Sequence, residues 1–199
     1  FLPLFFTILK NTRVIRFTIE NVFMDSVEGD YLEFGTFTGS SLNHAINSYK
    51  IIYKNQNTKI YSFDSFQGFP EENHKIFKSN DYLGNYSNAI KVASKYKNCE
   101  IVKGFFKDTL NDEVLKNKIN KISIVFIDCD LAISSKDIFD FIKSRLSYGS
   151  FIIIDDFFNI DFDKNSIRNE FYKRFQKSDF EITRYFGLQG VVLRYLGQS

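Results

Sequence analysis

The stretch 29–41 constrains the fold of this chain more than any other, because it has the pattern of a strand, a glycine turn and a helix start. Its first part, Tyr31–Phe34, has the apolar and aromatic character of a buried strand. The strand pattern then breaks at Gly35 and Gly39, and the pair Ser40–Ser41 is of the residue type that caps a helix N-terminus. This succession is how an open α/β sheet builds a ligand site at the carboxyl edge of its strands.

A carboxylate, Glu33, stands near the end of this predicted strand. Burying a carboxylate costs free energy unless a cation or hydrogen-bond donors meet it, so Glu33 disfavours a phosphate ligand and favours one that carries an ammonium group. The spacing of Gly35 and Gly39 also differs from the G-x-G-x-x-G pattern of dinucleotide-binding turns. Phe37 stands where that pattern has its middle glycine, and its side chain blocks the close approach of a pyrophosphate.

Strand and helix patterns alternate along the rest of the chain. The run 122–127 is almost continuously apolar, which is typical of a central parallel strand. Alternation of this kind predicts an α/β fold with a doubly wound, mostly parallel sheet. We expect strands at 31–34, 59–63, 100–103, 122–127, 150–154, 180–186 and 190–195, and helices at 13–27, 41–53, 85–96, 110–118, 135–146 and 166–176.

The composition predicts a single folded domain over residues 1–199, with 1–28 as an N-terminal helical or lid segment. Aromatic residues make up 18% of the chain, which supports a full core. The 26 basic and 24 acidic residues give a net charge of +2, so we expect no nucleic-acid partner. Two cysteines make no disulfide framework, which fits a reducing, cytoplasmic location.

The first residues form an apolar run, 1–9, that is too short to span a membrane and lacks the charged start of a signal peptide. We therefore expect no membrane span. The run packs either on the domain itself or on a second copy of the chain in a homo-oligomer.

Acidic residues end three further predicted strands. Asp64 ends the second strand, the fourth runs into Asp128–Asp130, and the fifth runs into Asp155–Asp156. Carboxylates at neighbouring strand ends repel one another unless a divalent cation binds between them, and oxygen ligands favour Mg²⁺ or another hard ion. The alternative is structural: Asp130 caps the following helix and Asp155–Asp156 lie in a solvated loop.

Together these motifs resemble the macrocin O-methyltransferase family of class I S-adenosylmethionine-dependent, metal-dependent methyltransferases, over residues 13–195. The family has a glycine where this chain has Cys129. The resemblance implies a Rossmann-like sheet of seven strands with a last antiparallel strand. The motifs that carry it are Glu33-x-Gly35-x-x-x-Gly39-x-Ser41, Asp-Ser-Phe-Gln-Gly-Phe-Pro at 64–70, Gly-Phe-Phe-Lys-Asp-Thr-Leu at 104–110, and the two aspartate clusters.

The same resemblance implies roles for individual residues. Asp64 accepts hydrogen bonds from both ribose hydroxyls of S-adenosylmethionine, for which its two oxygens are suited. The base that removes the acceptor proton is His74, in the loop after that motif, or else Asp128 or Asp130. The implied donor-binding residues are Glu33, Gly35, Thr36, Phe37, Ser41, Asp64, Ser65, Phe66, Gly104 and Phe105. The implied Mg²⁺ ligands are Asp128, Asp155 and Asp156.

The function implied is transfer of a methyl group to a hydroxyl of a small-molecule sugar, nucleotide-sugar or glycoside. Two alternatives stay open at the level of the sequence: a nucleotide-binding oxidoreductase, and a Rossmann-like module that binds its ligand without turnover. The missing third glycine and Phe37 argue against the first alternative. The intact aspartate cluster argues against the second.

Overall fold

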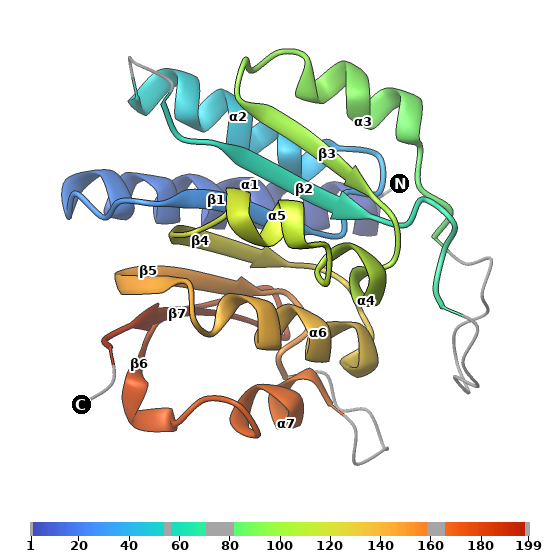
Figure 1. Ribbon diagram of the computed structural model, residues 1–199. Coiled ribbons are helices and arrows are strands. Elements are labelled where there is room, and N and C mark those ends of the chain that lie inside the picture. The colour runs from blue at the N-terminus through green and yellow to red at the C-terminus, as the bar shows by residue number, and fades with distance from the viewer. Residues whose placement is uncertain (1, 54–56, 71–81, 159–165, 198–199) are drawn as a thin grey trace.

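A seven-stranded sheet forms the middle of the molecule, with strand order β3-β2-β1-β4-β5-β7-β6 (Figure 1). The computed structural model describes residues 2–53, 57–70, 82–158 and 166–197, with side chains from residue 11 onward. The strands are β1 (Asp30–Phe34), β2 (Ile60–Asp64), β3 (Cys99–Lys103), β4 (Ile122–Ile127), β5 (Leu146–Ile154), β6 (Phe180–Phe186) and β7 (Gly190–Tyr195).

Strands β1 to β5 pair in parallel, whereas β7 runs antiparallel to both of its neighbours, β5 and β6. The expected doubly wound α/β fold, with an antiparallel last strand, is confirmed. The break in strand order lies where β1 is flanked by β2 and β4, which is the place where open α/β sheets bind their ligands.

Helices cover both faces of the sheet (Figure 1). Because successive residues of a strand point to opposite faces, the core divides into two clusters. One lies against α1, α2 and α3, and the other against α5, α6 and α7. The helices are α1 (Leu2–Met24), α2 (Ser40–Ile52), α3 (Tyr86–Ala93), α4 (Phe106–Thr109), α5 (Glu113–Lys118), α6 (Ala132–Ile142) and α7 (Ile167–Tyr172), with a 3₁₀ turn, η1, at Lys177–Asp179.

Several element boundaries differ from those expected. The helix predicted at 13–27 is part of the longer helix α1, which starts earlier and ends at Met24. The helix predicted at 110–118 begins later, at Glu113, because Asp112 caps it by accepting a hydrogen bond from the Leu115 amide at 2.9 Å. The short helix α4 precedes the predicted range. The helix predicted at 166–176 ends earlier, at Tyr172.

Strand β5 begins at Leu146, four residues before the predicted start at 150, and α6 accordingly ends at Ile142. The early part of β5 includes Gly149 with φ of +85°, and the pairing with β4 shifts register there. A bulge of this kind interrupts the alternation of apolar residues, which is why the pattern alone places the strand start too late.

Helix α1 is part of the core. Val14, Ile15, Ile19 and Val22 recur at helical spacing, and each is at most 1% exposed. They pack in the same cluster as residues from β1, β4 and β5. Among the described residues, none of the helices combines the length and the hydropathy that a membrane span requires.

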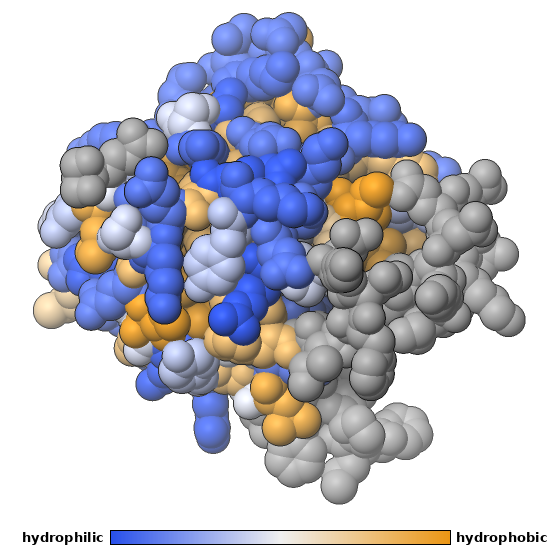
Figure 2. Space-filling view, turned by 90° about the horizontal axis from the view of Figure 1, so that it is seen from below, coloured by the Kyte–Doolittle hydropathy of each residue, from blue (hydrophilic) through white to orange (hydrophobic). Residues whose placement is uncertain are grey.

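The face seen from below in Figure 2 is mostly hydrophilic, and its apolar residues appear as separate patches on the described surface. Among the large apolar side chains that are exposed, Tyr185 and Leu188 belong to the β6–β7 hairpin. Scattered apolar residues of this kind are normal on a folded domain.

Candidate active site

A pocket of about 370 Å³ opens at the carboxyl ends of the central strands. Its wall combines the glycine turn after β1, the loops after β2 and β4, helices α4 and α6, and the aspartate pair after β5. The pocket therefore lies where the change in strand order places a ligand site.

The glycine turn is built against the end of β4. Gly35 has φ of +101°, and a Cβ at this position would lie 1.9 Å from the backbone oxygen of Asp128. Only glycine allows this approach. The Asp128 amide also donates a hydrogen bond to the Phe34 carbonyl oxygen at 2.9 Å. The turn and the first aspartate of the acidic cluster thus form one wall of the pocket.

The prediction that Ser40 or Ser41 caps α2 is wrong. The N-cap is Gly39, which has φ of +82° and makes no side-chain cap. The Ser41 hydroxyl instead donates a hydrogen bond to the Glu33 carboxylate at 3.0 Å. A buried carboxylate is a strong hydrogen-bond acceptor, and the turn places the Ser41 hydroxyl within its reach.

Glu33 is fully buried and is surrounded by hydroxyl groups. Its carboxylate accepts hydrogen bonds from Ser41, from Tyr31 at 3.1 Å and from Ser62 at 3.3 Å. Thr36 extends the network, since its hydroxyl lies 2.6 Å from that of Ser62. Burial raises the pKa of Glu33 to about 7, while the three hydrogen bonds act in the opposite direction. The network holds the turn on β1 and β2.

Asp64 has a different environment. Its carboxylate is half-buried, lines the pocket, and accepts backbone hydrogen bonds from Phe37 and Phe66, both at 2.7 Å. Burial raises the pKa of Asp64, against the effect of these backbone bonds. Phe37 and Phe66 have φ of +50° and +56°. Non-glycine residues hold this conformation only where the surrounding structure imposes it, which is common at ligand sites.

The structure brings part of the predicted donor-binding set together. The pocket wall includes Gly35, Phe37, Asp64, Ser65 and Phe105. Of the other described residues in that set, Glu33 and Thr36 are buried, and Ser41 contacts Glu33. Phe66 and Gly104 adjoin the wall residues Ser65 and Phe105 in the sequence. Direct contacts of these five with a donor stay predictions.

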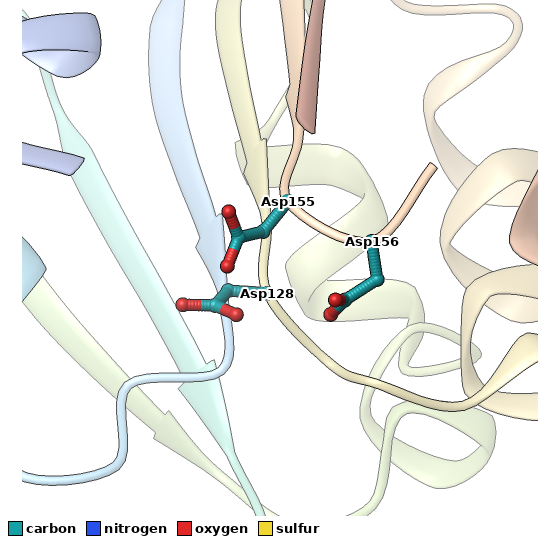
Figure 3. Close-up of side chains that lie close together, drawn as sticks. All are labelled: Asp128, Asp155 and Asp156. Atoms are coloured by element: carbon teal, nitrogen blue, oxygen red, sulfur yellow. The ribbon is translucent and has the colours of Figure 1, made fainter. Parts of the chain in front are cut away.

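The acidic cluster forms as predicted at the ends of β4 and β5. The carboxylates of Asp128, Asp155 and Asp156 point into one space (Figure 3), with one oxygen from each within 4.8 Å of the others. Three carboxylate oxygens so arranged fit a hard divalent cation such as Mg²⁺, which prefers oxygen ligands and keeps places for water or substrate oxygens.

The structural alternative for these aspartates fails on two points. Asp155 is only 6% exposed, so it does not lie in a solvated loop. Asp130 does not cap α6, because the N-cap is Leu131 and makes no side-chain cap. Asp130 lines the pocket instead, with φ of +57°. The predicted base His74 lies outside the described residues.

Sequence reasoning missed Asn11, Asp137 and Tyr82. Asn11 is a polar residue on the buried face of α1, and its side-chain amide donates to Asp128 Oδ2 at 3.5 Å. Asp137 of α6 and Tyr82 line the pocket, and burial raises the pKa of Asp137. The sequence did carry a signal for Asn11, because this residue stands at helical spacing from Ile15 and Thr18.

Comparison with known proteins decides the family. The model of the macrocin-O-methyltransferase family (TylF) matches residues 5–184. The chain belongs to the macrocin O-methyltransferase family. This membership argues against the oxidoreductase alternative.

Two curated relatives are O-methyltransferases by name. The 8-demethyl-8-(2,3-dimethoxy-α-L-rhamnosyl)-tetracenomycin-C 4′-O-methyltransferase of Streptomyces olivaceus is 27% identical over 167 residues, covering 75% of this chain and 60% of that protein. The mycinamicin III 3″-O-methyltransferase of Micromonospora griseorubida is 25% identical over 166 residues, covering 75% of this chain and 63% of that protein. The chain therefore spans about 60% of the length of the curated relatives it matches.

Solved structures show the same fold. The O-methyltransferase NovP has a TM-score of 0.76 at 21% identity, over 94% of this chain and 80% of that chain. The apo TDP-rhamnose 3′-O-methyltransferase of calicheamicin biosynthesis has a TM-score of 0.72 at 19% identity, over 97% of this chain and 83% of that chain. The fold of this chain is thus shared by proteins whose names specify O-methyl transfer.

Proposed function

We propose that the chain transfers the methyl group of S-adenosylmethionine to a hydroxyl of a sugar, nucleotide-sugar or glycoside, with the help of Mg²⁺ or another hard divalent cation. The observation that carries the proposal is the contact between Gly35 and Asp128, because it joins the donor turn to the acidic cluster in one pocket wall. The name of the Streptomyces olivaceus relative, which includes a rhamnosyl group, supports a sugar-containing acceptor.

The donor half of the site is the glycine turn with Asp64. The two oxygens of Asp64 each accept one backbone hydrogen bond and have a second lone pair with which to accept from a ribose hydroxyl. Phe37 and Phe105 supply apolar surface on the same wall. These groups hold a donor in one orientation, and orientation is a large part of the rate enhancement in group transfer.

The acceptor half is the acidic cluster. When bound, S-adenosylmethionine supplies an electrophilic methyl group, and a hard cation supplies positive charge that favours loss of the acceptor proton. Asp128, Asp155 and Asp156 hold the cation. His74, Asp128 or Asp130 accepts the proton. The buried position of Asp155 keeps its carboxylate on the cluster and limits competition by water.

A methyl-transfer assay tests the proposal. The protein is incubated with S-adenosylmethionine and a panel of sugar nucleotides and glycosides that includes TDP-rhamnose, with Mg²⁺ or with EDTA. We expect transfer to at least one acceptor, its loss in EDTA and its return with Mg²⁺. Asp155→Asn should reduce the response to Mg²⁺ more than it reduces donor binding, because Asp64 and the glycine turn are unchanged.

Asp25→Asn is a matched control, since Asp25 pairs with Arg194 on the surface at 2.6 Å. It should leave both donor binding and the Mg²⁺ response intact. Full activity of the Asp155→Asn variant in EDTA would show a metal-independent enzyme. Donor binding without transfer to any acceptor would favour the non-catalytic alternative.

A further inference from the structure

Asn11 of α1 has a side-chain contact with the acidic cluster. The side chain is buried, with the residue 6% exposed, and its amide nitrogen lies 3.5 Å from Asp128 Oδ2. The two residues are separated by 117 positions in the sequence. The contact therefore depends on how α1 packs against the sheet beside β4 and β5.

The side-chain oxygen of Asn11 is an unexplained acceptor. It is buried, and among the described residues it has no hydrogen-bond partner. Buried polar atoms in folded proteins are almost always paired, and an unpaired acceptor is destabilising. Asn11 lies behind Asp128, which lines the pocket, so a ligand group that reaches past Asp128 could supply the missing donor.

The charge around Asn11 decides which kind of ligand group fits. An acceptor oxygen beside the Asp128 carboxylate matches a cationic group with several N–H donors. Glu33, the acceptor that the sequence favoured for an ammonium group, is 0% exposed and already accepts from three hydroxyls. Asp128, by contrast, lines the pocket and touches the glycine turn at Gly35.

We propose that Asn11 binds the amino-acid end of the methyl donor, with its side-chain oxygen accepting a hydrogen bond from the donor's ammonium group next to Asp128. The inference rests on the proposed function and adds a residue of the N-terminal helix to the donor site. It assigns α1 a direct part in ligand binding, beyond its part in the core.

A pair of ligands separates this role from a general effect on the fold. S-adenosylhomocysteine carries the amino-acid end, whereas 5′-deoxy-5′-methylthioadenosine has the same nucleoside and sulfur without it. Calorimetry is done with both on the wild type and on Asn11→Leu, which keeps the size of the side chain and removes its polar atoms. Asn11→Leu should weaken S-adenosylhomocysteine binding by about 10-fold or more and leave methylthioadenosine binding unchanged.

Two further variants complete the design. Asn11→Asp keeps an acceptor oxygen and should recover part of the S-adenosylhomocysteine affinity that Asn11→Leu loses. Thr18→Val is the packing control, because Thr18 is buried on the same helix and its hydroxyl donates within the helix to the Val14 carbonyl at 2.9 Å. It should leave the binding of both ligands unchanged.

Four results would overturn the assignment. Equal S-adenosylhomocysteine affinity in the wild type and Asn11→Leu would show that Asn11 is not in the donor site. Equal weakening of both ligands by Asn11→Leu would show a structural role only. A loss of Mn²⁺ binding by Asn11→Leu with unchanged S-adenosylhomocysteine binding would place Asn11 with the metal instead. Failure of the wild type to bind S-adenosylhomocysteine would remove the proposed function itself, together with this assignment.

Discussion

Glu33 and Asp64 are acids on neighbouring strands, and their surroundings give them different roles. Glu33 accepts hydrogen bonds from three hydroxyl groups and is 0% exposed, so its role is to stabilise the glycine turn. Asp64 accepts from two backbone amides and faces the pocket, so it can act on a ligand. Residue type alone does not separate the two roles, because burial and donor geometry decide them.

The raised pKa of Glu33 predicts how stability depends on pH. The carboxyl titrates near 4.5 in the unfolded chain and near 7 in the folded protein. Between these values the folded state holds the proton more tightly, so stability falls as pH rises through this window and levels off above it. Glu33→Gln cannot ionise and should escape this loss, which is up to about 3 kcal/mol.

Urea unfolding of the wild type and of Glu33→Gln at pH 5 and pH 8 measures the effect. The free energy of unfolding of Glu33→Gln, relative to that of the wild type, should be larger at pH 8 than at pH 5. If the two proteins change in parallel between these values, Glu33 does not carry a raised pKa.

Asp64 carries a prediction about donor binding. Removal of its carboxylate by Asp64→Ala takes away both acceptor oxygens at the end of β2 and frees the amides of Phe37 and Phe66. We expect the wild type to bind S-adenosylhomocysteine in the micromolar range, about 8 kcal/mol. The variant should bind at least about 10-fold more weakly by calorimetry, because charge-assisted hydrogen bonds are lost. Unchanged affinity would place the ribose elsewhere.

At the scale of elements, the pocket depends on how closely β1 and β4 approach after their last paired residues. The turn after β1 touches the backbone at Asp128 through Gly35, and β5 brings Asp155 to the same edge. Neighbouring strands hold one another in place in the sheet, so a shift of the glycine turn after β1 also moves the ends of β4 and β5. We therefore expect a change at the contact between Gly35 and Asp128 to alter both the glycine turn and the acidic cluster.

A pair of glycine substitutions tests this coupling. Gly35→Ala places a Cβ 1.9 Å from the Asp128 oxygen, whereas Gly39→Ala meets no atom nearer than 3.4 Å. Both positions have positive φ, so both variants carry backbone strain. Gly35→Ala should cost roughly 2–4 kcal/mol, and Gly39→Ala about 1–2 kcal/mol.

The readouts are urea unfolding, S-adenosylhomocysteine affinity and the rise in melting temperature on addition of Mg²⁺. Gly35→Ala should reduce both ligand responses together, and Gly39→Ala should keep the Mg²⁺ response. A Gly35→Ala variant with normal Mg²⁺ response would show that the two halves of the pocket are independent.

At the scale of the whole molecule, α1 closes one face of the sheet and also reaches the site. Its apolar side chains pack with strand residues in one of the two core clusters, and Asn11 contacts Asp128. A helix that only covered a ligand would not need a buried apolar face of this kind. The site should therefore be lost when the packing of α1 is lost.

Ile19→Ala tests the packing of α1. Ile19 is 0% exposed, so removing its side-chain atoms leaves a cavity and should lower the free energy of unfolding by about 2–5 kcal/mol. Met24 on the same helix is 77% exposed, and Met24→Ala should change stability by less than about 0.5 kcal/mol. Urea unfolding measures both. A negligible effect of Ile19→Ala would mean that α1 is a detachable lid.

The sequence by itself determined the order of strands and helices, the glycine turn and the acids at strand ends. These are local properties, since side-chain periodicity and residue type show which face of an element is buried and where it ends. The α/β fold, the seven strands and the aspartates at two neighbouring strand ends could therefore be predicted, because the carboxyl ends of parallel strands lie along one edge of a sheet. The choice of Asp128, Asp155 and Asp156 among those aspartates came from the family resemblance.

Only the tertiary structure decided which groups meet those residues. Glu33 meets Ser62, 29 positions away, and Asn11 meets Asp128, 117 positions away. The true cap of α2 and the early start of β5 likewise depend on a backbone turn and a register shift in the sheet. Contacts between distant residues depend on how helices pack on the sheet, and the local pattern of either partner carries no information about that packing.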